Sequence, residues 1–403
     1  MPTLVTLSLI VLLALPGLAA ADAVTEWNQV ANAAVATAAQ NPMVASRTTA
    51  LMHAAIFDAV NAVEARYQPY KIATAAPAGA SAEAAAIGAA HGVLTRLYPA
   101  QRATFDQALE RSLGRLADGP ARRDGLALGA RVGADMVALR ERDGADAPSV
   151  YRPTTTPGVY VPTAAAAGSQ WGSVTPWVLA RGSQFRPPAP PALTSAEWLR
   201  DAEEMRLLGA KTSTARTPEQ TEIGRFWAVT GPASWDPFLR AVAAAPGRSL
   251  LDNARLFALA EMAAADAYIA VFDAKYAYNF WRPITAIRNG DTYGGAVARV
   301  ADWEPLIETP MHPEYPCAHC ITSAAIAAVL EAELGSSPFR EIVLTSPTAP
   351  GATRRWTSAK AYTDEISSAR IYAGVHYRTS TVVGQQMGRQ IGELAVRQYL
   401  RPR

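Results

Sequence analysis

The chain has 403 residues, of which 50% are hydrophobic, 18% are charged and 29 are proline, and its formal net charge is +2. This length is enough for one large hydrophobic core or for two smaller domains. Because the charge is nearly balanced and lysine and arginine form no basic stripe, the composition argues against nucleic acid or an anionic membrane surface as a partner.

The first 21 residues have the pattern of a secretory signal. An apolar stretch from Leu4 to about Leu15 is followed by Pro16-Gly17 and by small residues suited to cleavage, although no Lys or Arg precedes it. The stretch is too short and too interrupted to span a membrane. We therefore expect a signal peptide at 1–21, export to the periplasm or the medium, and no membrane span in the mature chain.

Residues 22–144 predict an N-terminal helical region. Apolar side chains recur at helical spacing in three segments, 48–67, 82–98 and 120–142. His53 and His91 lie on these helices with no partner pattern, so we interpret both as structural. From 145 to 193 the proline density excludes helix interiors, which predicts a long connection that wraps the surface or lines a site.

Residues 194–403 predict a second helical region. Thr217 with Gln220 has the spacing of a capping box. The apolar pattern then predicts helices over 250 to about 279, from near His319 onward, and over about 362–398. No segment alternates as a strand does. The sequence therefore predicts an all-α fold, either one large helical bundle or two packed bundles.

The scarcest reactive side chains lie together in "HPEYPCAHC", residues 312–320, which holds two of the five histidines and both cysteines. Attachment of c-type haem requires a histidine directly after the second cysteine, where Ile321 stands. A tyrosine-phosphatase loop requires an arginine where Ile326 stands. A structural zinc site lacks a second ligand pair, and a redox dithiol of the thioredoxin type lacks its βαβ context.

Cationic side chains flank this cluster in the sequence. Lys275 and Arg282 precede it, and Arg370 and His376 follow it. Arginine pairs bidentately with oxyanions, lysine adds a point charge, and the amides at a helix start near 316–319 point toward a bound anion. A histidine can then act as ligand or nucleophile while another moves protons.

In this order, Lys275…Arg282-Pro283, Pro316-Cys317-Ala318-His319 and Arg370…His376 resemble the three-part signature of the vanadium-dependent haloperoxidases. Bacterial acid phosphatases and type-2 phosphatidic acid phosphatases share it. The segments "RTPEQTEIGRFW" and "YRP…QFRPP" are similar to the bacterial haloperoxidase-like branch.

The resemblance implies a role for each matching residue. Lys275, Arg282 and Arg370 would hold the oxygens of vanadate, or of phosphate in the same site. His376 would be the axial vanadium ligand or a phosphohistidine nucleophile, and His319 the general acid–base. His312 occupies the position where bromide-oxidising members carry histidine and chloride-oxidising members carry phenylalanine, which favours bromide.

Three positions depart from the family pattern. Cys317 replaces a serine whose hydroxyl bonds the oxyanion, and Ala318 replaces a glycine, which is tolerated only at negative φ. Ser380 replaces the aspartate that orients the axial histidine, so the sequence predicts a less basic His376.

The sequence thus predicts a vanadate-dependent haloperoxidase that uses hydrogen peroxide and halide. Two alternatives remain open, namely an acid phosphatase acting on phosphoesters at the same site and a non-catalytic phosphate- or vanadate-binding protein. Cys317 and Cys320 have the separation of a first helical turn. A disulfide between them and a pair of buried thiols are both compatible with the sequence.

Overall fold

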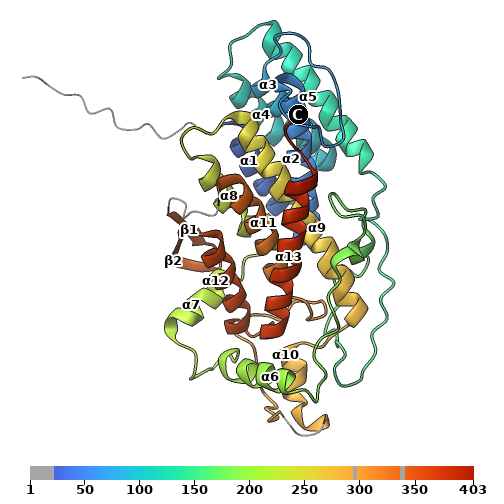
Figure 1. Cartoon of the computed structure of the whole chain (residues 1–403), viewed down its shortest axis with the longest axis vertical. Coiled ribbons are helices and arrows are strands. Elements are labelled where there is room, and N and C mark those ends of the chain that lie inside the picture. Colours follow the sequence, from blue (N-terminus) through green and yellow to red (C-terminus); the bar gives the residue numbers. More distant parts are fainter. Residues whose placement is uncertain (1–21, 294–296, 336–340) are drawn as a thin grey trace, which may run out of the picture.

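The computed structural model describes residues 22–293, 297–335 and 341–403. The predicted signal peptide lies outside these ranges. Within them the chain forms thirteen α-helices, five short 3₁₀ helices and one two-stranded hairpin, which confirms the predicted all-α fold (Figure 1). No helix in the described ranges is long and apolar enough to cross a membrane.

The N-terminal helical region packs around one buried helix, α2. This helix is capped by Asn41, whose side chain accepts the amide N–H groups of Met43 and Val44, and nearly every side chain from Met43 to Asn61 is buried. Burial on all sides requires neighbours on all sides, which the surrounding helices supply. Helix α2 (Pro42–Glu64) contacts α1 (Ala23–Thr37), α3 (Ala82–Leu97), α5 (Pro120–Leu139) and a helix of the second region, α9 (Leu250–Tyr278), while α4 (Arg102–Leu113) packs on α3.

Helix α9 (Leu250–Tyr278) connects the two helical regions through a shared core. It begins at the capping box of Ser249 and Asp252 and ends at Asn279 in the left-handed conformation, close to the predicted bounds. It packs against α2 on one side and against α11 (Ala318–Leu334) on another. One hydrophobic cluster runs from Ala23 to Leu400. The predicted boundaries at 144 and 193 therefore mark changes in the sequence, but they do not separate two hydrophobic cores.

Helix α11 lies directly against α13 (Arg378–Gln398) because small residues line their contact. A Cβ atom at Gly388 would lie 2.1 Å from the carbonyl oxygen of Ile321, which is closer than any side chain tolerates. This close approach brings the start of α13 beside the start of α11. The remaining helices are α6 (Ala196–Leu208), α7 (Pro218–Phe226), α8 (Asp236–Ala243), α10 (Pro283–Arg288) and α12 (Ala359–Tyr372).

The single helix predicted over 362–398 is wrong, because the structure has two helices there. Helix α12 ends at Tyr372 and α13 begins at Arg378. Gly374 has φ +80° between them, a conformation that stops the helix and that glycine adopts without steric cost. The interruption places His376 in the short link between the two helices.

A short antiparallel hairpin, β1 (Ile342–Ser346) and β2 (Ala349–Trp356), was not predicted. Residues in the two strands alternate between buried and exposed for only a few positions, and Pro347 and Pro350 interrupt the pattern, so the sequence gives no clear strand signal. The hairpin packs on α7, α8 and α12, away from the start of α11.

The proline-rich connection wraps the bundle, as predicted, and runs down one side of the molecule from α5 to α6 (Figure 1). Only two 3₁₀ turns, Trp171–Ser173 and Gly182–Phe185, form within it. The carboxylate of Asp266 on α9 accepts three consecutive backbone N–H groups, those of Trp177, Val178 and Leu179, at 2.7–2.8 Å. The hydroxyl of Tyr276 donates to the Ala167 carbonyl, and this contact brings the connection to the edge of a cavity.

Candidate active site

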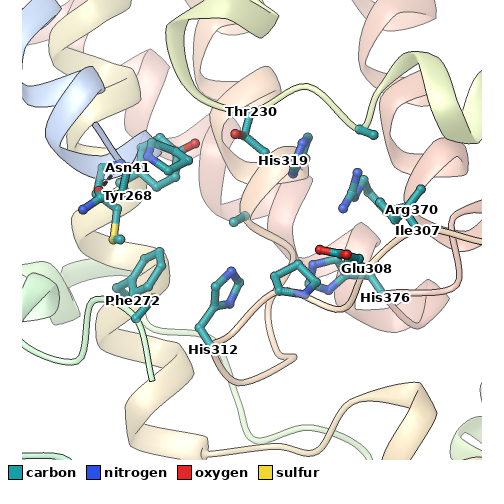
Figure 2. A pocket seen from close by; sticks show the side chains of 16 residues that line it. Asn41, Thr230, Tyr268, Phe272, Ile307, Glu308, His312, His319, Arg370 and His376 are labelled. Atoms are coloured by element: carbon teal, nitrogen blue, oxygen red, sulfur yellow. Dashed lines mark hydrogen bonds between the residues drawn. The ribbon is translucent and has the colours of Figure 1, made fainter. Parts of the chain in front are cut away.

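Three of the five histidines converge on one cavity of about 250 Å³, although they are far apart in the sequence. His319 at the start of α11, Arg370 at the end of α12 and His376 in the following turn form one side (Figure 2). Tyr268 and Phe272 of α9 form the facing side, and His312 lies between the two sides. The full lining is Asn41, Pro42, Met43, Ala167, Ala228, Thr230, Tyr268, Phe272, Ile307, Glu308, Pro310, His312, Ala318, His319, Arg370 and His376.

His376 is held so that one ring nitrogen presents a lone pair. Its Nδ1 lies 2.8 Å from the carboxylate of Glu314, which can only accept, so Nδ1 carries the proton. Its Nε2 lies 3.3 Å from a guanidinium nitrogen of Arg282, which can only donate. Burial, followed by the charge of Arg282, lowers the pKa of His376 well below its ordinary value. The ring is therefore neutral, with Nε2 available as a ligand or nucleophile.

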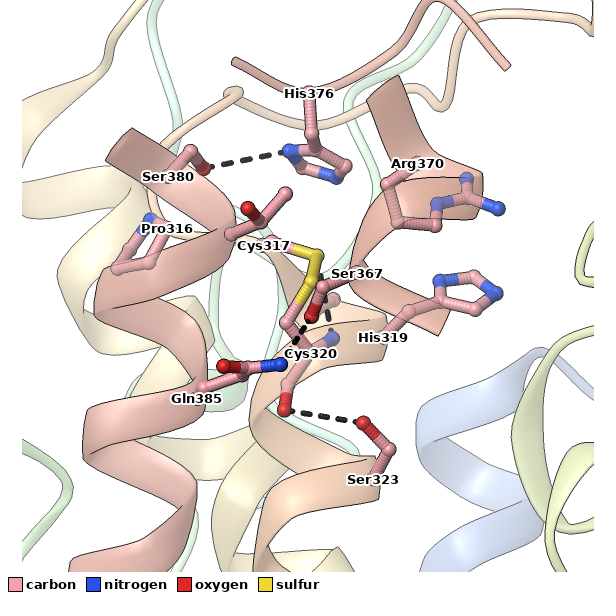
Figure 3. Close-up of a disulfide and its surroundings, with 12 residues drawn as sticks. Pro316, Cys317, His319, Cys320, Ser323, Ser367, Arg370, His376, Ser380 and Gln385 are labelled. Atoms are coloured by element: carbon pink, nitrogen blue, oxygen red, sulfur yellow. Dashed lines mark hydrogen bonds between the residues drawn. A yellow bond between two sulfur atoms is a disulfide. The ribbon is translucent and has the colours of Figure 1, made fainter. Parts of the chain in front are cut away.

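Glu314 is the functional residue that the sequence interpretation missed. It is fully buried, and its Oε1 accepts both the Nδ1–H of His376 and the backbone N–H of Tyr377. Ser380, expected to orient His376 alone, lies 3.5 Å from Nδ1 (Figure 3). A carboxylate therefore does face the histidine, but it comes from the loop before α11 and not from the position of Ser380. The one available signal was an acidic residue inside a segment of buried prolines and aromatics.

Arg370 provides the donor most clearly directed at a ligand. The side chain is 1% exposed, and one terminal nitrogen donates to the carbonyl of Trp227 at 2.8 Å. Its Nε is buried and has no partner, although the residue lines the cavity. A buried guanidinium N–H without an acceptor is costly, and an oxyanion in the cavity would satisfy it. Burial, followed by the charge of Arg282, lowers the pKa of Arg370 to about 9.

Arg282 lies behind the histidines and fixes two of them. Its Nε donates to the carbonyl of His312 at 2.9 Å, and a terminal nitrogen donates to Nδ1 of the same residue at 2.9 Å. Nδ1 of His312 also lies 3.1 Å from the carbonyl of Pro313, so it faces both a donor and an acceptor, and these contacts do not select one tautomer. Burial, followed by the charge of Lys275, lowers the pKa of His312 well below its usual value, so the ring is neutral.

Lys275 is placed differently from the prediction. Its ammonium donates to the carbonyls of Pro313 and Glu314 at 2.9 and 2.8 Å and also to that of Pro316. These three bonds use all three of its hydrogens, and Lys275 does not line the cavity. Its donors therefore hold the loop that carries Glu314, and only its charge acts on the cavity.

The start of α11 combines His319 with a disulfide. Cys317 is the N-cap, and the structure joins it to Cys320 with a Cα–Cα distance of 5.4 Å (Figure 3). The first-turn amides of a helix have no intrahelical acceptor, so those of Ala318 and His319 are suited to an anion. Ala318 is the first helical residue, so its φ is negative and the missing glycine is tolerated. Nε2 of His319 lies 3.0 Å from the carbonyl of Val229, which places the proton on Nε2 and the lone pair on Nδ1.

The charges of the site do not balance. Three buried cations, Lys275, Arg282 and Arg370, face the single buried carboxylate of Glu314. Burial raises the pKa of Glu314 to about 7, and Lys275 opposes this increase. Glu308 also lines the cavity, but it is exposed at the rim. A cavity with excess positive charge and an unpartnered Arg370 Nε is suited to an oxyanion such as vanadate or phosphate.

Comparison with known proteins agrees with this geometry. Residues 255–402 match the family model described as the second helical-bundle domain of vanadium chloroperoxidase. The vanadium chloroperoxidase of Curvularia inaequalis is 30% identical over 142 residues, which cover 29% of this chain and 23% of that protein. The sequence match thus spans less than a quarter of that relative.

Solved structures resemble nearly the whole chain. A bacterial vanadium-dependent iodoperoxidase superimposes with a TM-score of 0.79 and 24% identity over 94% of this chain and 95% of the other. A holo bacterial vanadium-dependent chloroperoxidase gives a TM-score of 0.72 and 18% identity over 95% and 93%. The C-terminal part of the chain thus matches the family model of the second helical-bundle domain, and nearly the whole chain has the fold of these vanadium-dependent haloperoxidases.

Proposed function

We propose that the chain is a vanadate-dependent haloperoxidase that oxidises halide, bromide preferentially, with hydrogen peroxide. The observation that carries the proposal is the buried, unpartnered Nε of Arg370 beside the lone pair of His376 Nε2 in one cavity with excess positive charge. The superfamily relatives support the same reaction class.

His376 Nε2, Arg370 and the first-turn amides of α11 would hold vanadate. When bound, vanadate supplies Lewis-acid activation of peroxide without a change of metal oxidation state. Lys275 and Arg282 keep the local potential positive, and Glu314 keeps the Nδ1 proton of His376 in place. His319 accepts a proton at Nδ1 while its Nε2–H remains bonded to the Val229 carbonyl.

Bromide preference rests on His312. Its neutral imidazole lines the cavity and can donate an N–H to an anion there, which a phenylalanine ring cannot do. The similar solved structures are an iodoperoxidase and chloroperoxidases, so fold alone leaves the halide open. We expect kcat/KM for bromide to exceed that for chloride, and His312→Phe to reduce this ratio; a chloride preference in the unaltered chain would contradict the assignment.

Reconstitution tests the reaction. The chain is dialysed against EDTA, reloaded with orthovanadate, and assayed for bromination of phenol red with peroxide and bromide. We expect activity only after vanadate is added, and loss of activity when phosphate competes for the site. Hydrolysis of p-nitrophenyl phosphate that vanadate inhibits, without bromination, would instead support the acid phosphatase. Vanadate binding without either turnover would leave a non-catalytic binding protein.

The proposal includes export directed by residues 1–21. The disulfide between Cys317 and Cys320 is compatible with an oxidising compartment. Alkylation of the extracytoplasmic protein without reductant, followed by mass spectrometry, checks both points. We expect the protein outside the cytoplasm with neither cysteine labelled.

A further inference from the structure

The cavity wall that faces the oxyanion side chains contains a thioether. Met43, the second residue of α2, is 5% exposed and lines the same cavity as His312, Arg370 and His376. Among the cavity-lining residues it is the one that contains sulfur. The facing side also contains Phe272 and Tyr268 (Figure 2), and a thioether reacts with hypohalous acid faster than either ring does.

The space behind this sulfur is filled by the proline-rich connection. A Cβ atom at Gly168 would lie 2.6 Å from Sδ of Met43 and 2.7 Å from the ring of Phe272. Gly168 has φ +69°, so both its conformation and its surroundings require the absence of a side chain. An oxygen added to the sulfur therefore finds space on the cavity side, where the oxidant is formed.

We propose that Met43 is a self-oxidation site at which the enzyme converts its own thioether to methionine sulfoxide during turnover. The inference rests on the proposed function, because the oxidant is the hypohalous acid made from peroxide and halide in this cavity. The halogen is transferred to sulfur and hydroxide leaves; water then attacks sulfur, the S–O bond forms, and halide departs. Sulfur loses two electrons, the halogen gains them, and the net products are sulfoxide, halide and one proton.

Sulfoxide formation at Met43 would limit the number of turnovers that each enzyme molecule completes before it loses activity. It converts a flexible apolar side chain into a larger polar one. The cavity is small, about 250 Å³, and the new oxygen would occupy part of the space that Arg370 and His376 also line. Each enzyme molecule thus loses activity as a function of turnovers completed rather than of time.

The chain supplies an internal control in Met311. This residue is partly exposed, accepts a hydrogen bond from the Thr163 hydroxyl at 3.5 Å, and lines a different hollow. Met311 is partly exposed, whereas Met43 is accessible only through the cavity, so oxidant in bulk solvent reacts first with Met311. Oxidant made in the cavity reaches Met43 first.

The experiment uses the full vanadate-loaded chain with limiting peroxide and bromide, in excess free methionine to remove hypobromous acid that escapes. A parallel reaction with phenol red and without free methionine measures dye bromination. Catalase stops the reaction, and peptide mapping gives the sulfoxide fraction at each methionine. We expect sulfoxide at Met43 to exceed that at Met311 by roughly tenfold or more, since accessibility to the oxidant sets the rate. Reagent hypobromite added to the same enzyme without peroxide should reverse this order.

Two conservative variants separate the effect on activity. Met43→Leu keeps the side-chain volume and removes the sulfur. We expect it to lose a smaller fraction of its own initial rate per turnover than the unaltered chain, whereas Met311→Leu should decay as the unaltered chain does. Dye bromination with equal sulfoxide at Met43 and Met311, or with Met311 ahead, overturns the inference alone. Absence of dye bromination overturns the proposed function and the inference with it.

Discussion

Two polar clusters, one around His53 and one around His376, are equally buried. They differ in the hydrogen-bond partners of the histidine and in whether its ring lines a cavity. Burial, followed by the charge of Arg240, lowers the pKa of His53 to about 3. Its Nε2 accepts from Asn28, which also donates to Asp236, and the ring stacks on Phe257 at 4.6 Å. His53 is fully buried and does not line the cavity that contains His376.

His376 is equally buried, and its Nε2 also accepts a hydrogen bond, from Arg282 at 3.3 Å, but it differs from His53 at Nδ1 and in its surroundings. The carboxylate of Glu314 holds its Nδ1–H, and the ring lines a cavity that also contains Arg370, whose Nε has no partner. In the His53 cluster an amide occupies the lone pair, and the N–H at Nδ1 has no partner. Burial and a lowered pKa therefore do not identify a catalytic histidine. A fixed tautomer that faces an electropositive cavity does.

The largest expected effect separates alanine variants of the two histidines. His376→Ala should reduce vanadate-dependent bromination by about a thousandfold or more, as expected when a group that contacts the reacting centre is removed. His53→Ala should leave kcat of the folded enzyme unchanged and reduce the free energy of unfolding by about 2–4 kcal/mol through the cavity it creates. Steady-state kinetics and urea unfolding on both variants check this. Equal losses of activity would remove the distinction between the clusters.

The next largest effect should be on vanadate binding, when Arg370, whose Nε has no partner, is removed. Arg370→Ala deletes a buried cation that faces the ligand, at a cost of about 3–5 kcal/mol in vanadate binding measured by calorimetry. Arg389→Ala is the matched control, because Arg389 lies on the outer face of α13 and pairs with Glu331. Arg370→Lys keeps the charge without the guanidinium fork and should bind with intermediate affinity. Unchanged affinity in Arg370→Ala would exclude Arg370 from the site.

Glu314 should contribute more than Ser380 to holding His376. Glu314→Gln keeps the shape but removes the charge, and we expect vanadate affinity to fall about 10–100-fold. Ser380→Ala should change it little, because the serine hydroxyl lies at 3.5 Å whereas the carboxylate lies at 2.8 Å. Vanadate titrations of the two variants decide the order. A larger loss in Ser380→Ala would return the orienting role to the position predicted from the sequence.

The smallest expected effect is on the pH dependence of stability. The pKa of His53 falls from 6.5 in the unfolded chain to about 3 in the folded one, so below pH 6.5 only the unfolded chain binds a proton there. The stabilisation is present above pH 6.5 and is lost as the pH falls toward 3, by about 1.4 kcal/mol per pH unit. His53→Gln retains an acceptor for Asn28 and should reduce this slope by one proton between pH 6.5 and 5, in urea unfolding. An unchanged slope would show that His53 does not titrate as inferred.

Local sequence patterns were sufficient for most helices and for the order of the site residues. The Ser249–Asp252 capping box and the apolar run after it place α9 because capping and side-chain periodicity act within a few residues. The long-range convergence of Arg282, His319, Arg370 and His376 followed from the family resemblance. The spacing of these residues in the sequence does not by itself predict how close in space residues about a hundred positions apart lie.

The tertiary structure alone decided how the donors are used. The sequence shows that Lys275, Glu314 and Ser380 have suitable chemistry, but hydrogen-bond geometry determines which atom meets which. Three carbonyls of the 313–316 loop occupy the lysine, and the same loop delivers Glu314 to His376. The sequence by itself therefore determined the all-α class, several of the long helices, the cationic side chains and the residue types of the site. Packing determined the tautomers and the open Nε of Arg370, because these depend on partners distant in the chain.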